Sequence, residues 1–187
     1  MRQLALLPKP SLEHGSSLRT GKRKIARPID TKRAMHLVMR ATRARGPWSM
    51  LREEHKPKIE RLVHLASSRH GVRVYRFSNV GNHLHLLVRA RTRVGFQNFL
   101  RVITAQTAAL ATGARKGNPK GRFWDALAYS RVVSWGREFK KLQAYLSKNL
   151  LEGMRLFLRG PRGSWTVLAK LKDVEAASRE LGKHLQV

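Results

Sequence analysis

The sequence predicts an α+β fold in which an antiparallel sheet carries helices on one face. Segments with alternating apolar residues, typical of strands, are interleaved with segments whose apolar residues recur every three or four positions, typical of helices. Their order, βαββαβ followed by a helix, is that of a ferredoxin-like or RRM-like sheet. Such an arrangement leaves the second face of the sheet open for a ligand, and both RNA binders and DNA-processing enzymes use it.

The individual elements follow from local patterns. The first helix begins near Pro57, because proline is tolerated in a first helical turn, and Gly71 ends it. The turn Val80–Asn82 joins two strands into a hairpin. We expect strands at 35–39, 72–77, 83–89 and 127–133, and helices from about 57 to 70, 94 to 111 and 137 to 150.

Composition divides the chain into three parts. Residues 1–30 are rich in proline, serine, glycine and basic residues, which predicts a flexible basic arm. Residues 31–155 predict the globular domain. Residues 156–187 predict a linker, with a breaker at 159–163, and a final amphipathic helix that carries Leu168, Leu171, Val174 and Leu181.

The charge of the chain points to a polyanionic partner. Thirty-nine Lys and Arg residues against eleven Asp and Glu residues give a formal charge of +28 and a pI near 11.8. Nucleic acid is the expected partner, because such a surface attracts phosphates. A ribosomal-type or nucleoid-packing protein and a basic membrane-surface binder are the alternatives. The chain has no cysteine and no apolar run long enough to span a bilayer, so we expect a cytoplasmic protein associated with the bacterial nucleoid.

Two histidines stand out in the third strand. Side chains alternate along a strand, so His83 and His85 point to the same face, whereas Leu84, Leu86 and Val88 form the apolar face. Two imidazoles on the open face can bind one metal ion, although two surface histidines on a basic strand would show the same pattern. A divalent ion needs further ligands, so a third oxygen or nitrogen donor is expected.

The helix at 137–150 offers that donor. Phe139, Leu142, Leu146 and Leu150 form its apolar stripe. Tyr145 and Asn149 are four residues apart and therefore lie one above the other along the edge of the stripe. The amide of Asn149 could complete a metal site with the phenol of Tyr145 beside it. An interfacial tyrosine and a helix-terminal asparagine would look the same.

Together the two motifs resemble a known family. The segment Asn82–Val88, which reads Asn-His-Leu-His-Leu-Leu-Val, resembles the HUH strand of the single-tyrosine transposases, in which two histidines flank a bulky apolar residue. The segment Tyr145–Asn149 resembles their catalytic helix. Within the family the sequence is most similar to the REP-associated tyrosine transposases, on the segments Gly121–Trp124 and Tyr129–Val133. The resemblance spans about residues 33–155.

The resemblance implies a DNA strand-transferase. Tyr145 would cleave single-stranded DNA, leaving a 5′-phosphotyrosine and a free 3′-hydroxyl, and His83, His85 and Asn149 would hold a divalent metal, Mg²⁺ or Mn²⁺. Because a phenol has a pKa of about 10, the metal and a nearby cation such as Lys148 would have to favour its ionised form. The domain at 31–155 would then be the catalytic domain, an HUH endonuclease palm.

The resemblance further suggests a DNA hairpin from a repetitive palindromic (REP) element as substrate. The residues expected to contact it are Lys22, Arg23 and Lys24 in the arm, Lys116, Lys120, Arg122 and Trp124 in and after the loop at 113–121, and Lys148. Trp124 could stack on a base, but an aromatic residue beside the sheet more often belongs to the core. The terminal helix has three open roles: packing on the domain, exchange within a homodimer, or contact with DNA.

Two rival functions stay open at this point. An RRM-like RNA binder would carry aromatic residues on the open sheet face, where bases stack. The third strand carries histidines instead, which favours the enzyme. A non-catalytic nucleoid-type protein would make the histidine, tyrosine and asparagine set a coincidence.

Overall fold

The computed structural model describes residues 12–16 and 25–158, and gives residues 150–158 as helix backbone only. Lys22, Arg23, Lys24 and the expected final helix with Leu168 lie outside the described residues. The chain divides after Gly153 into two units, and the description below concerns the first. In the part that the structure describes, no helix is both long and apolar enough to cross a membrane.

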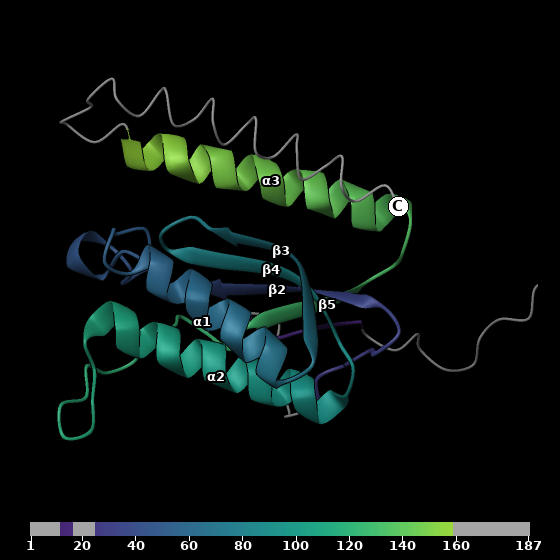
Figure 1. Cartoon of the computed structure of the whole chain (residues 1–187), viewed down its shortest axis with the longest axis horizontal. Coiled ribbons are helices and arrows are strands. Elements are labelled where there is room, and N and C mark those ends of the chain that lie inside the picture. Colours follow the sequence, from purple (N-terminus) through teal and green to yellow (C-terminus); the bar gives the residue numbers. More distant parts are fainter. Residues whose placement is uncertain (1–11, 17–24, 159–187) are drawn as a thin grey trace, which may run out of the picture. The chain divides into compact units, whose positions relative to one another are not determined.

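The described residues build one five-stranded sheet (Figure 1). Its strands are β1 (Glu13–His14), β2 (Ala34–Arg40), β3 (Val72–Asn79), β4 (His83–Ala90) and β5 (Tyr129–Val133). They lie in the order β1-β5-β2-β4-β3, and every neighbouring pair is antiparallel. Apart from the added β1, this is the ferredoxin-like strand order with β2 and β4 in the centre. The predicted fold class is therefore confirmed.

Two helices cover one face of the sheet, α1 (Lys56–Arg69) and α2 (Arg93–Thr112). Pro57 lies in the first turn of α1, and α2 begins where the Thr92 side chain accepts a hydrogen bond from the Gly95 amide, 3.0 Å away. Gly113, with a φ of 69°, ends α2 in the left-handed conformation that glycine adopts without strain. Both helix boundaries agree with the prediction to within one residue.

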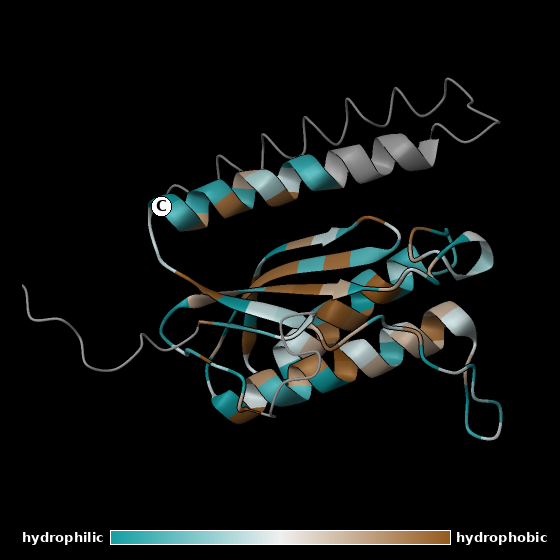
Figure 2. Ribbon diagram, turned by 180° about the vertical axis from the view of Figure 1, so that it is seen from behind, coloured by the Kyte–Doolittle hydropathy of each residue, from teal (hydrophilic) through white to brown (hydrophobic). Residues whose placement is uncertain are grey.

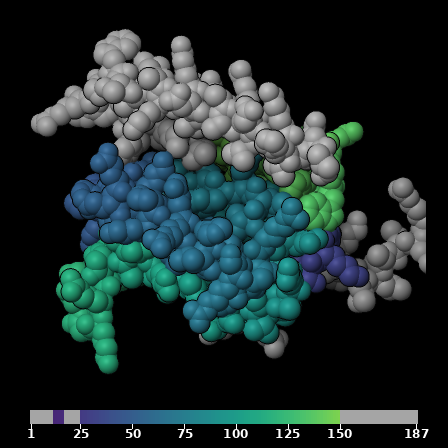
Figure 3. Space-filling view, in the orientation of Figure 1, coloured from purple at the N-terminus to yellow at the C-terminus, as the bar shows by residue number. Residues whose placement is uncertain are grey.

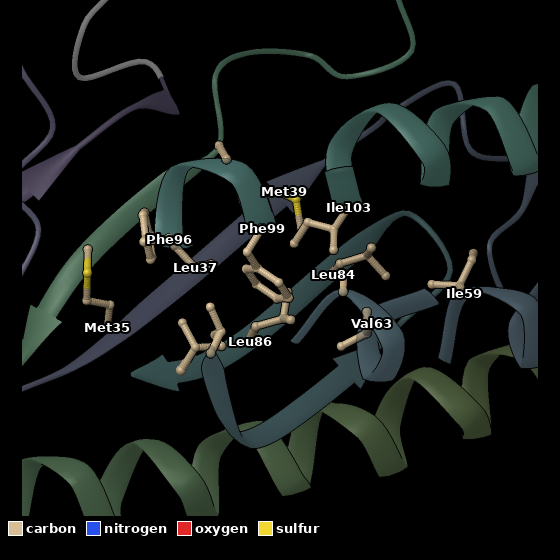
Figure 4. Close-up of a cluster of buried hydrophobic side chains, with 14 of the residues drawn as sticks. Met35, Leu37, Met39, Ile59, Val63, Leu84, Leu86, Phe96, Phe99 and Ile103 are labelled. Atoms are coloured by element: carbon tan, nitrogen blue, oxygen red, sulfur yellow. The ribbon is translucent and has the colours of Figure 1, made fainter. Parts of the chain in front are cut away.

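The main core lies between this helix pair and the sheet. Its side chains include the predicted apolar face of β4, and Figure 4 shows that they point toward one another from the sheet and from both helices. The residues labelled there are Met35, Leu37, Met39, Ile59, Val63, Leu84, Leu86, Phe96, Phe99 and Ile103. Figure 2 colours the residues by hydropathy. The sides of α1 and α2 that face the sheet carry most of the apolar residues of these helices.

The opposite sheet face is only partly open. Helix α3 (Arg137–Leu158) buries Leu142 and Leu146 in a second cluster with Leu87, Ala34 and Val133 of the sheet. The apolar stripe predicted for this helix is thus confirmed at Leu142 and Leu146. The expectation that the face opposite α1 and α2 stays open is wrong. The apolar stripe of α3 needs an apolar surface to pack on, and Leu87 provides one.

Strand β5 begins two residues later than predicted and β3 ends two residues later, and two larger differences concern α3 and the N-terminal arm. Helix α3 continues to Leu158 rather than ending at Leu150, because the segment between them contains no proline and only one glycine. The arm at 1–30 was expected to lack structure, yet Glu13–His14 forms β1, which pairs with Arg131 and Ser130 of β5. This pairing gives the backbone groups at the edge of β5 hydrogen-bonding partners.

Candidate functional site

The side chains of the candidate site lie on the face of the sheet opposite α1 and α2. His83 and His85 share this face with His36 of β2, because the register pairs His36 with Leu87 and Val38 with His85. The ring centres of His83 and His85 are 6.0 Å apart, and those of His85 and His36 are 5.8 Å apart. The planes within each pair differ by only 16° and 12°. The sheet therefore presents three nearly parallel imidazoles in a row.

The turn before β4 fixes where the histidines begin. Asn79, at the end of β3, accepts a hydrogen bond from the Gly81 amide (3.0 Å) and donates one to the Met50 carbonyl (2.7 Å). Asn79 is almost fully buried, so these bonds also satisfy its amide. The hairpin turn is thus attached to the segment before α1, and the first residue of β4 is His83.

His83 is oriented by its neighbour. Its Nδ1 atom donates to the Oδ1 atom of Asn82 at 2.7 Å, which leaves Nε2 for a ligand. Partial burial and the nearby charge of Arg40 lower the pKa of His83, with Asp125 acting in the opposite direction. The ring is therefore neutral at pH 7, the form in which imidazole binds a metal.

His85 and His36 are buried more deeply. Burial and the neighbouring His83 lower the pKa of His85 to about 4. Burial, His85 and Arg131 lower that of His36 to the same value. Among the described residues, the Nδ1 atom of His85 and the Nε2 atom of His36 are buried without a hydrogen-bond partner. A buried nitrogen without a hydrogen-bond partner costs free energy, so a purely structural role for these two histidines would destabilise the fold.

These observations fit a divalent cation at His83 and His85, because both rings are neutral and lie side by side. In the described ranges, no group of three His, Cys, Asp or Glu side chains could complete a metal site. Within the described residues, a further donor would be of another type, such as an amide.

The structure places Tyr145 and Asn149 on α3, where Tyr145 is 51% exposed and Asn149 is half-buried. Leu146, next to Tyr145, packs in the cluster of Leu87, which is two residues from His85 on the same face. The helix thus docks on the strand that carries the histidines. No hydrogen bond or ring contact within the described residues joins Tyr145 or Asn149 to the imidazoles. Their assembly around one metal remains a prediction.

His83 lines a cavity of about 280 Å³ together with Asp125 and Tyr129. The sequence did not predict either of these two as a site residue. Asp125 accepts hydrogen bonds from the amide and hydroxyl of Thr42, each at 2.8 Å, and lies 3.5 Å from the Arg40 guanidinium. The sequence could have indicated Asp125, because it is the only acidic residue between Glu60 and Glu138.

The second is Tyr129 of β5, whose ring meets His36 edge-on at 6.4 Å. Burial and the Glu13 carboxylate raise the pKa of Tyr129, which disfavours its phenolate. Tyr129 therefore lies closer to the histidines than the sequence suggested, but its surroundings oppose a nucleophilic role.

The residues expected to bind DNA are spread over several places. The loop at 113–121 protrudes from the body beyond α2 (Figure 3), and its Lys116 is exposed, whereas Lys120 is half-buried. The Arg122 guanidinium donates to the Trp124 carbonyl at 2.9 Å. Lys148 is exposed on α3, next to Asn149.

Trp124 belongs to the edge of the core. Its ring nitrogen donates to the Thr104 carbonyl of α2 at 2.9 Å, and the ring packs against the main core and meets Phe123 edge-on. This packing accounts for Trp124 without DNA, so base stacking by its ring stays a prediction.

Comparison with known proteins identifies the family. Residues 31–149, well over half of the chain, match the family described as IS200-like transposases. A solved structure from Deinococcus radiodurans R1, whose description names a transposase, is similar with 12% identity and a TM-score of 0.41. The similarity covers 68% of this chain and 98% of that one. A comparison with curated proteins gave no match. This chain belongs to the family of IS200-like transposases.

Proposed function

We propose that this transposase cleaves and rejoins single-stranded DNA through a 5′-phosphotyrosine on Tyr145, as single-tyrosine HUH enzymes do. The observation that carries the proposal is the pair of neutral imidazoles, His83 and His85, side by side on one face of β4. The docking of α3 on the same strand through Leu146 supports it, because α3 carries the tyrosine. The charge of +28 suits a DNA substrate.

The proposed metal ligands are His83, His85 and Asn149, and the proposed ion is Mg²⁺ or Mn²⁺. A divalent cation bound there supplies positive charge at the scissile phosphate. Asn82 holds the His83 ring in the tautomer that leaves Nε2 available. Asp125 contributes a carboxylate at the edge of the site and is kept in place by Thr42.

The proposed chemistry is a transesterification. The phenol oxygen of Tyr145 attacks phosphorus, and the bond from phosphorus to the 3′ oxygen breaks. The phenol proton passes to solvent, and the leaving oxygen takes up a proton to become the 3′-hydroxyl. One phosphodiester replaces another, so a 3′-hydroxyl can later attack the phosphotyrosine and rejoin the strands without ATP.

The proposed substrate is a DNA hairpin with a single-stranded flank, as in the REP-associated transposases. The basic residues proposed to grip it are Lys22, Arg23, Lys24, Lys116, Lys120, Arg122 and Lys148. Each would contribute a phosphate contact and a salt-dependent share of the affinity. The homodimer and the association with the nucleoid stay predictions of the sequence.

The direct test is the formation of a covalent adduct. Incubating the protein with a 5′-labelled or 3′-labelled hairpin oligonucleotide and Mn²⁺ should give a denaturant-resistant protein–DNA band that carries only the 3′ label. Tyr145→Phe should abolish the band, because phenylalanine has no nucleophile, and His83→Ala should reduce it at least about 100-fold, since it removes a metal ligand.

Tyr75→Phe is the matched control, because Tyr75 lies on β3 and packs edge-on against Phe139. It should leave the band unchanged. DNA binding by the wild type without any adduct would instead favour a non-catalytic basic nucleic-acid binder. An adduct that survives Tyr145→Phe would assign the nucleophile elsewhere.

A further inference from the structure

Three arginines gather at the end of the sheet away from His83. The register places Arg73 of β3 directly opposite Arg89 of β4, so both side chains leave the sheet on the same face. Arg91 follows just beyond β4, and its backbone amide donates to the Gly71 carbonyl at 3.0 Å. A cavity of about 350 Å³ is lined by all three arginines together with Ser67 and Ser68 at the end of α1.

This arginine cluster (Arg73, Arg89 and Arg91) forms no ion pair with any acidic side chain that the structure describes. The ion pairs formed within the described residues use other arginines, namely Arg33, Arg40, Arg52 and Arg131. Like charges directly opposite on neighbouring strands destabilise a sheet. The guanidinium of Arg73 lies over the Tyr75 ring, 5.2 Å from its centre. Within the described residues, the three arginines thus line one cavity without an ion pair that offsets their repulsion.

Protection of the sheet edge explains only one of the three arginines, Arg73. Charged side chains on an edge strand discourage pairing with another chain, and Arg73 lies on the edge strand β3. Arg89, however, lies on a central strand, and Arg91 lies beyond the end of that strand. A ligand with several negative charges accounts for all three.

We propose that the arginine cluster is a second DNA-binding site, which binds phosphodiester groups of the backbone. Arg89 and Arg91 follow His85 by four and six residues, which is roughly 14–20 Å along an extended strand. Leu87 and the docked Leu146 lie between the two regions, so the cluster is separate from the histidines. Phosphates bound there belong to DNA remote from the cleaved bond. The inference rests on the proposed function only for its partner, DNA.

The test is the salt dependence of DNA affinity in EDTA, where no cleavage is needed. Fluorescence anisotropy would follow two probes between 50 and 300 mM NaCl, a stem-only hairpin and an unstructured single strand. The triple variant R73Q/R89Q/R91Q should lower the slope of log K against log salt by about 2–3 on a duplex stem, or about 2 on a single strand. R73K/R89K/R91K should keep most of the slope, because it keeps the charges.

The matched control is R45Q/R61Q/R101Q, which removes three exposed arginines from other parts of the surface and changes the net charge equally. Its slope should fall by less than about 1. A fall confined to one probe assigns the cluster to duplex or to single-stranded phosphates, and both results support it. Equal falls for the glutamine variant and the control on both probes, with unchanged circular dichroism, would overturn it. Adduct formation tests the proposed chemistry independently.

Discussion

At the scale of single residues, the bond from His83 to Asn82 decides which nitrogen of the imidazole is available. A ring nitrogen that donates to a fixed oxygen sets the tautomer, and the other nitrogen keeps its lone pair. Asn82 is therefore proposed as a positioning residue for the metal site rather than as a ligand.

Asn82→Ala should weaken Mn²⁺ binding by about 10–100-fold, because His83 loses its orienting partner. Isothermal titration calorimetry would measure the affinity, and thermal melting would show that the fold persists. Asn118→Ala, an exposed position in the loop after α2, is the control and should bind Mn²⁺ as the wild type does. Unchanged affinity in Asn82→Ala would show that the bond plays no part in metal binding.

The buried imidazoles also make stability depend on pH. Burial lowers the pKa values of His36 and His85 to about 4, well below the value of about 6.5 in an unfolded chain. Below pH 6.5 the unfolded chain binds protons that the folded chain does not, so stability is full above pH 6.5 and falls as the pH drops toward 4. The carboxylates Asp30, Asp125 and Glu138, whose pKa values are lowered, matter only at still lower pH.

Between pH 7 and pH 5, the free energy of unfolding should therefore fall by about 2 kcal/mol for each of the two imidazoles. Urea denaturation at several pH values in EDTA would measure it. His36→Gln should make the dependence shallower, whereas His64→Gln, at an exposed position of α1, should leave it unchanged. A stability that is constant over this range would contradict the burial of both rings as neutral groups.

Sequence reasoning finds some site residues and misses others for a simple reason. The pair His83 and His85 follows from the two-residue alternation of one strand, which is a local property. Asp125 and Tyr129 join the site only through the pairing of β5 with β2 and through the bonds of Asp125 to Thr42. Such contacts depend on tertiary register, which no local pattern encodes.

At the scale of elements, α3 links the packing of the fold to its chemistry. Leu146 is fully buried against the sheet, and the adjacent Tyr145 is exposed. The helix is thus held by a narrow stripe while it presents the proposed nucleophile to solvent.

Leu146→Ala should lower the free energy of unfolding by about 2–5 kcal/mol and should also reduce adduct formation, because α3 loses a fully buried side chain in the cluster that contains Leu87. Leu65→Ala, at a position of α1 that is 57% exposed, is the matched control and should change stability by less than about 0.5 kcal/mol. Urea unfolding and the adduct assay measure both effects. Equal stability of the two variants would mean that α3 is not docked through Leu146.

The sequence predicts elements best where periodicity is long. Helices α1 and α2 span several turns with a single apolar face, so their bounds were predicted closely. Strand β1 has only two residues and is stabilised by its partner β5. Two residues are too few to show the alternation that predicts a strand. The end of α3 was predicted too early, because the helix continues past Leu150, the last residue of the predicted apolar stripe.

At the scale of the whole molecule, sheet topology and charge together support the proposed function. The ferredoxin-like order puts β2 and β4, which carry His36, His83 and His85, side by side in the centre. The helix pair α1 and α2 leaves the other face to the histidines and to α3. The strong positive charge of the chain suits a DNA partner, and we propose that the DNA binds on this face. Tyr145 is proposed to become joined to DNA there.

Peptide mapping of the adduct by tandem mass spectrometry tests this claim most directly. The chain has three tyrosines, and cleavage after Lys and Arg separates them into the peptides 74–76, 123–131 and 142–148. After the DNA is digested to a residual nucleotide, the phosphotyrosine should appear only on the peptide 142–148. A modification on the peptide 123–131 would make Tyr129 the nucleophile, and an unmodified protein after incubation with hairpin DNA and Mn²⁺ would contradict covalent catalysis.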